Sequence, residues 1–79
     1  MSRYHEIWNE IKRAEQCVFT ISKAEAPTVI QGVLRTKSAE NVARRAAGKV
    51  GWSKLSIKKE EISETHLRVT LALIYSTYL

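Results

Sequence analysis

The sequence contains no aspartate, and its only adjacent acidic residues are Glu60 and Glu61. Enzymes that hold Mg²⁺, such as many nucleases, phosphatases and polymerases, usually need clustered carboxylates. Glu60 and Glu61 follow Lys58 and Lys59 in a predicted turn. Neighbouring charges of both signs in a turn are typical of a solvated hairpin tip. The sequence therefore predicts no metal centre and no metal-dependent hydrolase.

Cysteine and histidine are almost as scarce. Cys17 is the only thiol, and His5 and His66 are the only imidazoles, so a zinc site lacks ligands. A lone cysteine cannot close an intramolecular disulfide, and a small secreted domain normally has several, so we expect a cytoplasmic protein. Cys17 is interpreted as a small buried hydrophobe. Walker, GxGxxG, GxSxG and HExxH motifs are missing, so we expect no enzyme activity and no cofactor.

Proline and glycine occur once and three times in 79 residues, which leaves no linker to divide the chain. We therefore predict a single domain over residues 1–79. Hydrophobic residues make up 44% and charged residues 27%, the balance of a soluble globular domain. A chain this short has a thin core, which dimerisation would support. Its longest apolar run, Leu71 to Tyr75, is too short to span a bilayer.

The first half of the chain predicts one helix and two strands. Apolar residues recur at helical spacing in residues 3–15, which indicates an amphipathic helix. Residues 17–21 are apolar and rich in strand formers, and Pro27 then sets the entry to the next element. Residues 28–36 predict a second strand, with Ile30, Gly32 and Leu34 facing the core. Gly32 would mark a bulge, or a place where a helix lies close to the sheet.

A second helix is predicted to begin near Ser38, which can cap it. Its apolar stripe consists almost entirely of small residues, so we expect it to lie tightly against the sheet. Gly51 is predicted as the left-handed residue after the helix, with Trp52 folding back on the last turn. The stripe comprises Ala39, Val42, Ala43, Ala46, Ala47 and Val50.

Two more strands are expected after this helix. Leu55 and Ile57 alternate with polar residues, residues 60–65 form a polar turn, and residues 67–75 alternate strictly. The opposite face of the last strand becomes apolar at Ala72 and Ile74. The predicted fold is therefore α+β in the order α-β-β-α-β-β, with a four-stranded, mostly antiparallel sheet and helices packed on one face.

The clearest functional signal is a local excess of positive charge. Residues 28–59 hold eight of the thirteen basic side chains against one acid, Glu40, a net charge of +7. A concentrated positive field attracts polyanions or acidic protein surfaces. Surface helices are often basic for solubility alone, but the imbalance exceeds what solubility requires. The predicted binding residues are Arg35, Lys37, Arg44, Arg45, Lys49, Lys54, Lys58 and Lys59.

Within this segment, KSAENVARRAAGK loosely resembles the Lys- and Ala-rich helix of double-stranded-RNA-binding domains. In that family the helix closes the domain, whereas here two strands are expected after it and the other contact regions have no match, so the assignment is not carried over. The chain also lacks an aromatic-rich strand for base stacking and a GxxG loop. Any nucleic-acid binding should therefore be directed at the backbone and weakly sequence-selective.

Three hypotheses follow from the sequence. The first is a small non-enzymatic module whose basic helix and strand surface engages nucleic-acid backbone or a nucleic-acid-handling complex. The second is an adaptor or a phage- or mobile-element-type inhibitor, of the kind represented by anti-CRISPR proteins, that binds a host protein surface; no motif links this chain to that class. The third, compatible with both, is a homodimer through the C-terminal strand, paired either edge to edge or face to face through Ala72, Ile74, Tyr75 and Tyr78.

Overall fold

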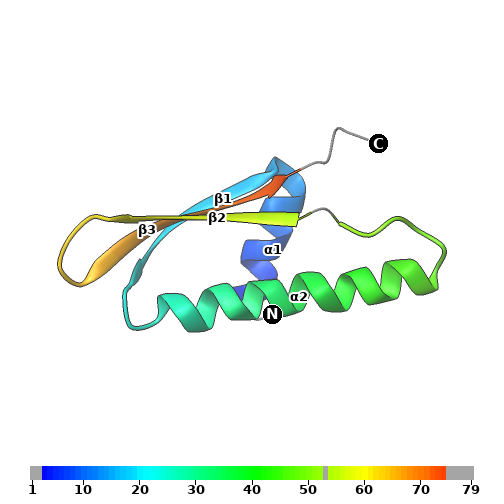
Figure 1. The fold of residues 1–79 in the computed structure, drawn as a ribbon, viewed down its shortest axis with the longest axis horizontal. Helices are drawn as coiled ribbons and strands as arrows, with labels where there is room; N and C mark the ends of the chain where they lie inside the picture. The colour runs from blue at the N-terminus through cyan, green and yellow to red at the C-terminus, as the bar shows by residue number, and fades with distance from the viewer. Residues whose placement is uncertain (1–2, 53, 75–79) are drawn as a thin grey trace.

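The structure is a computed structural model that describes residues 3–52 and 54–74. Two helices and three strands follow one another in the order α-β-α-β-β (Figure 1). The sequence-based prediction of an α+β fold is confirmed. The elements are α1 (Arg3–Ala14), β1 (Gln16–Ser22), α2 (Ala26–Ala46), β2 (Lys54–Glu61) and β3 (His66–Ile74).

The three strands form one antiparallel sheet in the order β1-β3-β2, so the predicted four-stranded sheet is wrong. Gln16 pairs with Ala72 and Ser22 with His66, while Lys54 pairs with Ile74 and Glu61 with Leu67. Because β1 and β2 each run antiparallel to β3, they are parallel to one another. They are connected through α2, with β3 inserted between them, which is a split β-α-β arrangement. The two helices cover one face of the sheet, as predicted (Figure 1).

The missing strand is the first part of α2. Residues 28–36 were expected to be extended, but they continue into the predicted second helix as one helix of 21 residues. Pro27 stands in its first turn, where a missing N–H costs nothing. The buried residues Ala26, Val29, Ile30 and Val33 have the spacing of one helix face. Val29, Ile30 and Val33 are β-branched and fit a strand equally well by propensity, and packing against the sheet decides for the helix.

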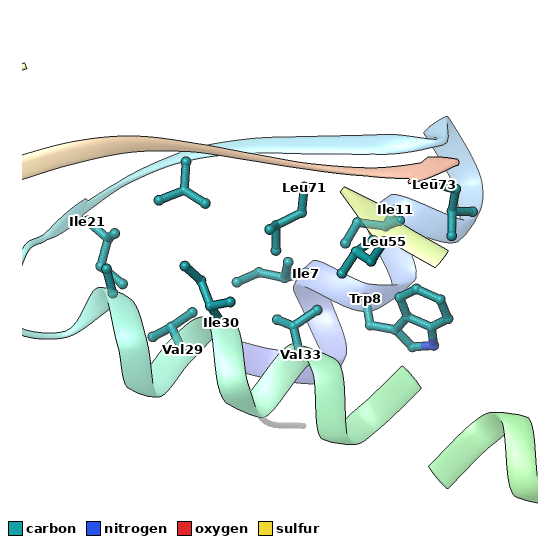
Figure 2. Packing of buried hydrophobic residues seen from close by; sticks show 12 residues of the cluster. Ile7, Trp8, Ile11, Ile21, Val29, Ile30, Val33, Leu55, Leu71 and Leu73 are labelled. Atoms are coloured by element: carbon teal, nitrogen blue, oxygen red, sulfur yellow. The ribbon is translucent and has the colours of Figure 1, made fainter. Parts of the chain in front are cut away.

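The core lies between the sheet and the two helices (Figure 2). Val29, Ile30 and Val33 point from α2 toward the sheet, and Trp8 and Ile11 of α1 are almost fully buried. The odd-numbered residues of the strands face this core. Its buried members are Ile7, Trp8, Ile11, Ile21, Ala26, Val29, Ile30, Val33, Leu55, Val69, Leu71 and Leu73.

Gly32 lies where the two helices touch. A Cβ built on Gly32 would stand 2.6 Å from ring atoms of Tyr4, closer than any normal contact. The ring of Tyr4 in α1 therefore rests against the bare backbone of α2. Gly32 does mark a close approach, but the approach is between α1 and α2. It is neither a bulge nor a contact between a helix and the sheet.

The Ala-rich stripe of α2 faces solvent, so the prediction that it packs tightly on the sheet is wrong. All six of its residues are exposed, with Val42 at 67% and Val50 at 83%. The buried face of α2 lies on the opposite side of the helix from this stripe. In the second half of α2, this buried face continues at Asn41. Gly48, with φ of +77°, takes the left-handed position after the helix, not Gly51 as predicted.

Candidate binding surface at the end of α2

The basic side chains divide into paired and unpaired groups. Four of them form ion pairs: Lys12 with Glu40 at 2.7 Å, Lys23 with Glu61 at 2.9 Å, Arg68 with Glu60 at 2.6 Å, and Arg13 with Glu10. All four lie outside residues 28–59. Within the described part of the chain, none of the eight predicted binding residues forms an ion pair. Their positive charge is therefore not neutralised by neighbouring carboxylates.

Five of the eight occur between the middle of α2 and the start of β2: three in the second half of α2, one in the loop after it and one at the first residue of β2. Lys37 and Arg45 lie one turn before and one turn after Asn41, which is hydrogen-bonded to Trp52 in that loop. The Nε of Arg45 lies 3.6 Å from where a Cβ on Gly51 would stand. We call the set Lys37, Arg44, Arg45, Lys49 and Lys54 the basic end.

The other three predicted residues lie elsewhere, so the eight do not form one continuous strip. Lys58 and Lys59 are consecutive in β2 and leave opposite faces of the sheet. Lys58 is on the face that no helix covers, beside Thr70. Arg35 lines a separate open hollow of about 550 Å³ between the two helices, together with Tyr4 and Gln31.

The end of α2 and the loop after it project beyond the sheet. The second half of α2 runs past the start of β2, and the chain returns through residues 47–52 (Figure 1). Arg44 holds the returning chain in place. Its Nε donates to the Val50 carbonyl at 2.7 Å, and its guanidinium lies 4.8 Å from the centre of the Trp52 ring. Arg44 is thus a structural residue of the loop.

Trp52 anchors the returning chain to α1 and α2 together. Its ring meets Trp8 edge to face at 5.8 Å, with an interplanar angle of 89°. Asn41, only 8% exposed, accepts from the Trp52 backbone N–H at 2.5 Å and donates to its carbonyl at 3.4 Å. Sequence reasoning missed Asn41, although it continues the inner face of α2 in a position where a polar side chain needs a partner.

Glu40 is the second residue that sequence reasoning missed, since it counted there only as the lone acid. Its carboxylate accepts from Lys12 and from the indole N–H of Trp52. Partial burial acts to raise the pKa of Glu40, but the hydrogen bonds from Lys12 and Trp52, the Lys12 charge and the Trp8 indole outweigh it. The net result is a pKa below the ordinary value. Glu40 is therefore charged at neutral pH and joins α1, α2 and the loop.

Potential metal ligands do not cluster in the described residues. No group of three or more His, Cys, Asp or Glu side chains lies close enough among them to hold a metal ion. Cys17 is half-buried, and its burial, followed by the charge of Glu10, raises the pKa of the thiol. It is therefore protonated at neutral pH and poorly suited to act as a nucleophile. Neither described helix combines the length and hydropathy of a membrane span.

Comparison with protein-family models, curated proteins and solved structures finds no significant match.

Proposed function

We propose that this protein is a non-enzymatic binding module that grips the phosphate backbone of a nucleic acid through its basic end. The observation that carries the proposal is the pairing pattern of the cations. Carboxylates neutralise Lys12, Lys23 and Arg68, whereas the basic end keeps its charge without an acidic partner among the described residues. Lysine and arginine side chains without acidic partners are suited to displace counterions from phosphates.

The rigidity of the basic end supports this proposal. The contacts of Asn41, Arg44 and Trp52 fix the loop, so Lys49 and Arg45 project from an ordered base. Arg44 and Arg45 also complement the negative end of the helix dipole, which is a structural reason for their presence. Lys49 and Lys54 lie outside the last turn of α2, and that explanation does not extend to them.

A charge-matched pair of variants tests the proposal. The triple variant Arg45→Gln, Lys49→Gln, Lys54→Gln removes three unpaired charges and leaves Arg44 to hold the loop. The control Arg13→Gln, Lys23→Gln, Arg68→Gln removes three charges that are already paired. Fluorescence anisotropy with labelled duplex and single-stranded oligonucleotides is measured over a range of salt concentrations.

We expect the wild type and the control to bind with affinity that falls steeply with salt. The test variant should bind at least about tenfold more weakly and with a shallower salt slope, because each lost phosphate contact reduces the slope by about 0.9. Equal losses of affinity in both triple variants would show that binding depends on the net charge of the protein and not on the basic end. Absence of salt-dependent binding by the wild type would refute the proposal.

A second candidate is an adaptor or inhibitor that binds a host protein, and two exposed valines, one in α2 and one in the loop after it, favour it. Val42 and Val50 are 67% and 83% exposed and stand beside the basic end. Apolar residues add little to backbone phosphate binding but contribute to protein interfaces. This candidate predicts a complex that survives nuclease treatment and is lost in Val42→Asp, Val50→Asp. Retention of that complex in the double variant would exclude this face as the interface.

A further inference from the structure

The sheet has two free edges, and the hydrogen-bond pattern shows which backbone groups of each edge strand point outward. On the β1 side, the Leu73 N–H donates to the Glu15 carbonyl at 3.0 Å and the Lys23 N–H donates to the Thr65 carbonyl at 2.8 Å. Both bonds continue the β1–β3 register beyond the ends of β1. In an antiparallel ladder, hydrogen-bonded positions alternate along a strand. The odd-numbered residues of β1 therefore bond to β3, and the even-numbered residues direct their N–H and carbonyl groups outward.

The outward groups of β1 are almost unused. The Ser22 carbonyl accepts from the Glu25 N–H, and no other backbone hydrogen bond of the described residues reaches the outer edge of β1. Gln16, Val18 and Thr20 thus present a row of unpaired donors and acceptors. All three side chains are exposed, with Val18 at 51%.

The edge formed by β2 differs from the edge formed by β1 in charge. Five of the eight residues of β2 are charged, and charged side chains, lysine especially, are a common means of blocking strand addition. By contrast, β1 has the sequence QCVFTIS and no charged residue. A neutral edge strand with open hydrogen-bonding groups lacks this protection and is a template for another strand.

We propose that the β1 edge pairs antiparallel with β1 of a second copy of this chain, about a two-fold axis at Phe19. This register places outward residue opposite outward residue, as backbone pairing requires, with Val18 opposite the second copy's Thr20. The two Phe19 rings meet on the helix-covered side, and Cys17 lies opposite Ile21. Gln16 meets Ser22 at each end, so polar residues lie opposite polar ones and no like charges come together.

Self-complementarity makes a second copy the occupant. An isologous interface needs one surface that matches itself, and the residues on either side of Phe19 satisfy this in both side-chain character and backbone polarity. Pairing would join two three-stranded sheets into one six-stranded sheet. The earlier expectation of edge-to-edge dimerisation through the last strand does not fit the fold, because β3 is central and paired on both sides. Tyr75 and Tyr78, which also belong to that predicted contact, lie outside the described residues.

Proline substitutions at the two edges test the proposal. Thr20→Pro removes an outward N–H of β1 and leaves the β1–β3 bonds intact. Lys59→Pro is the matched control, because the Ile62 N–H donates to the His66 carbonyl in the β2–β3 register, so odd-numbered residues of β2 point outward. Sedimentation velocity from micromolar to millimolar protein measures association, and far-UV circular dichroism checks the fold.

We expect the wild type and Lys59→Pro to shift toward dimer as concentration rises, and Thr20→Pro to remain a folded monomer. A wild-type monomer at all concentrations would overturn the proposal and leave the edge for an extended segment of another protein. A dimer that survives in folded Thr20→Pro would also overturn it.

A cysteine variant tests the register independently of proline. In a Cys17→Ser background, Phe19→Cys places two thiols opposite each other across the two-fold axis, within the range that a disulfide spans. Mild oxidation should yield covalent dimer, whereas Thr28→Cys in the same background, exposed on α2, should not. Equal cross-linking of both variants would reject the Phe19 axis.

Discussion

The two halves of α2 carry similar apolar patterns and have opposite surroundings. In the first half, Ala26, Val29, Ile30 and Val33 are buried beneath the sheet. In the second half, the apolar residues face solvent, while Glu40 and Asn41 occupy the inner side and bind the returning loop. The comparison shows that an apolar stripe identifies a helix face but does not identify what covers it. That depends on whether another element reaches the face.

The sharpest test of this comparison uses two valines of the same helix. Val33→Ala should destabilise the fold by about 2 kcal/mol, because Val33 is fully buried and its truncation leaves a cavity. Val42→Ala removes the same atoms from a side chain that is 67% exposed, so the free energy of unfolding should stay constant or rise by up to about 0.5 kcal/mol through helix propensity. Urea denaturation measures both. Equal losses would mean that the second half is also packed.

Asn41 tests whether polar contacts hold the second half in place. Asn41→Ala leaves the Trp52 N–H and carbonyl without their partner in a mostly buried position, so we expect a loss of about 1.5 kcal/mol. Ser38→Ala, at an exposed position one turn earlier, serves as the control and should change stability little. Thermal unfolding followed by tryptophan fluorescence reports both the stability and the setting of Trp52. An unchanged unfolding midpoint in Asn41→Ala would show that the ring contacts of Trp52 hold the loop without the help of Asn41.

The smallest expected effect concerns Glu40 and pH. Its pKa is lowered in the folded state, so the unfolded chain binds the proton more readily. The stability that Glu40 contributes is present above the ordinary value of 4.5 and is lost as pH falls through the lowered pKa. Glu40→Gln should cost about 1 kcal/mol or less at neutral pH and flatten the stability profile below 4.5. Urea denaturation of the wild type and of Glu40→Gln at a series of pH values measures both profiles, and profiles of the same shape would contradict this role of Glu40.

The sequence predicted the elements whose pattern had one interpretation. The helix near residues 3–15, the strand at residues 17–21 and the last two strands are confirmed, within a residue or a few at their ends. The strand predicted for residues 28–36 is wrong, because Val29, Ile30 and Val33 suit both a strand and a helix face. Pro27 in a first helical turn was the local signal for a helix.

The candidate site was predictable as a composition but not as an arrangement. Counting charges found the eight cations, and no sequence pattern showed that Lys58 and Arg35 would be separated from Lys49. The role of Arg44 depends on Val50 and Trp52, which approach it only because Gly48 turns the chain back. Such contacts arise from tertiary geometry. Glu40 and Asn41 were hidden for the same reason.

The central place of β3 has a consequence for how the chain folds. β1 and β2 share no hydrogen bonds, and every strand pairing in the sheet passes through β3, the last of the five described elements. Gln16 must find Ala72 across most of the chain before the β1 side of the sheet can form. Such non-local pairing slows folding, because the loop-closure entropy is lost before the contacts form. During synthesis, β1 must therefore wait for β3 with both of its edges unpaired.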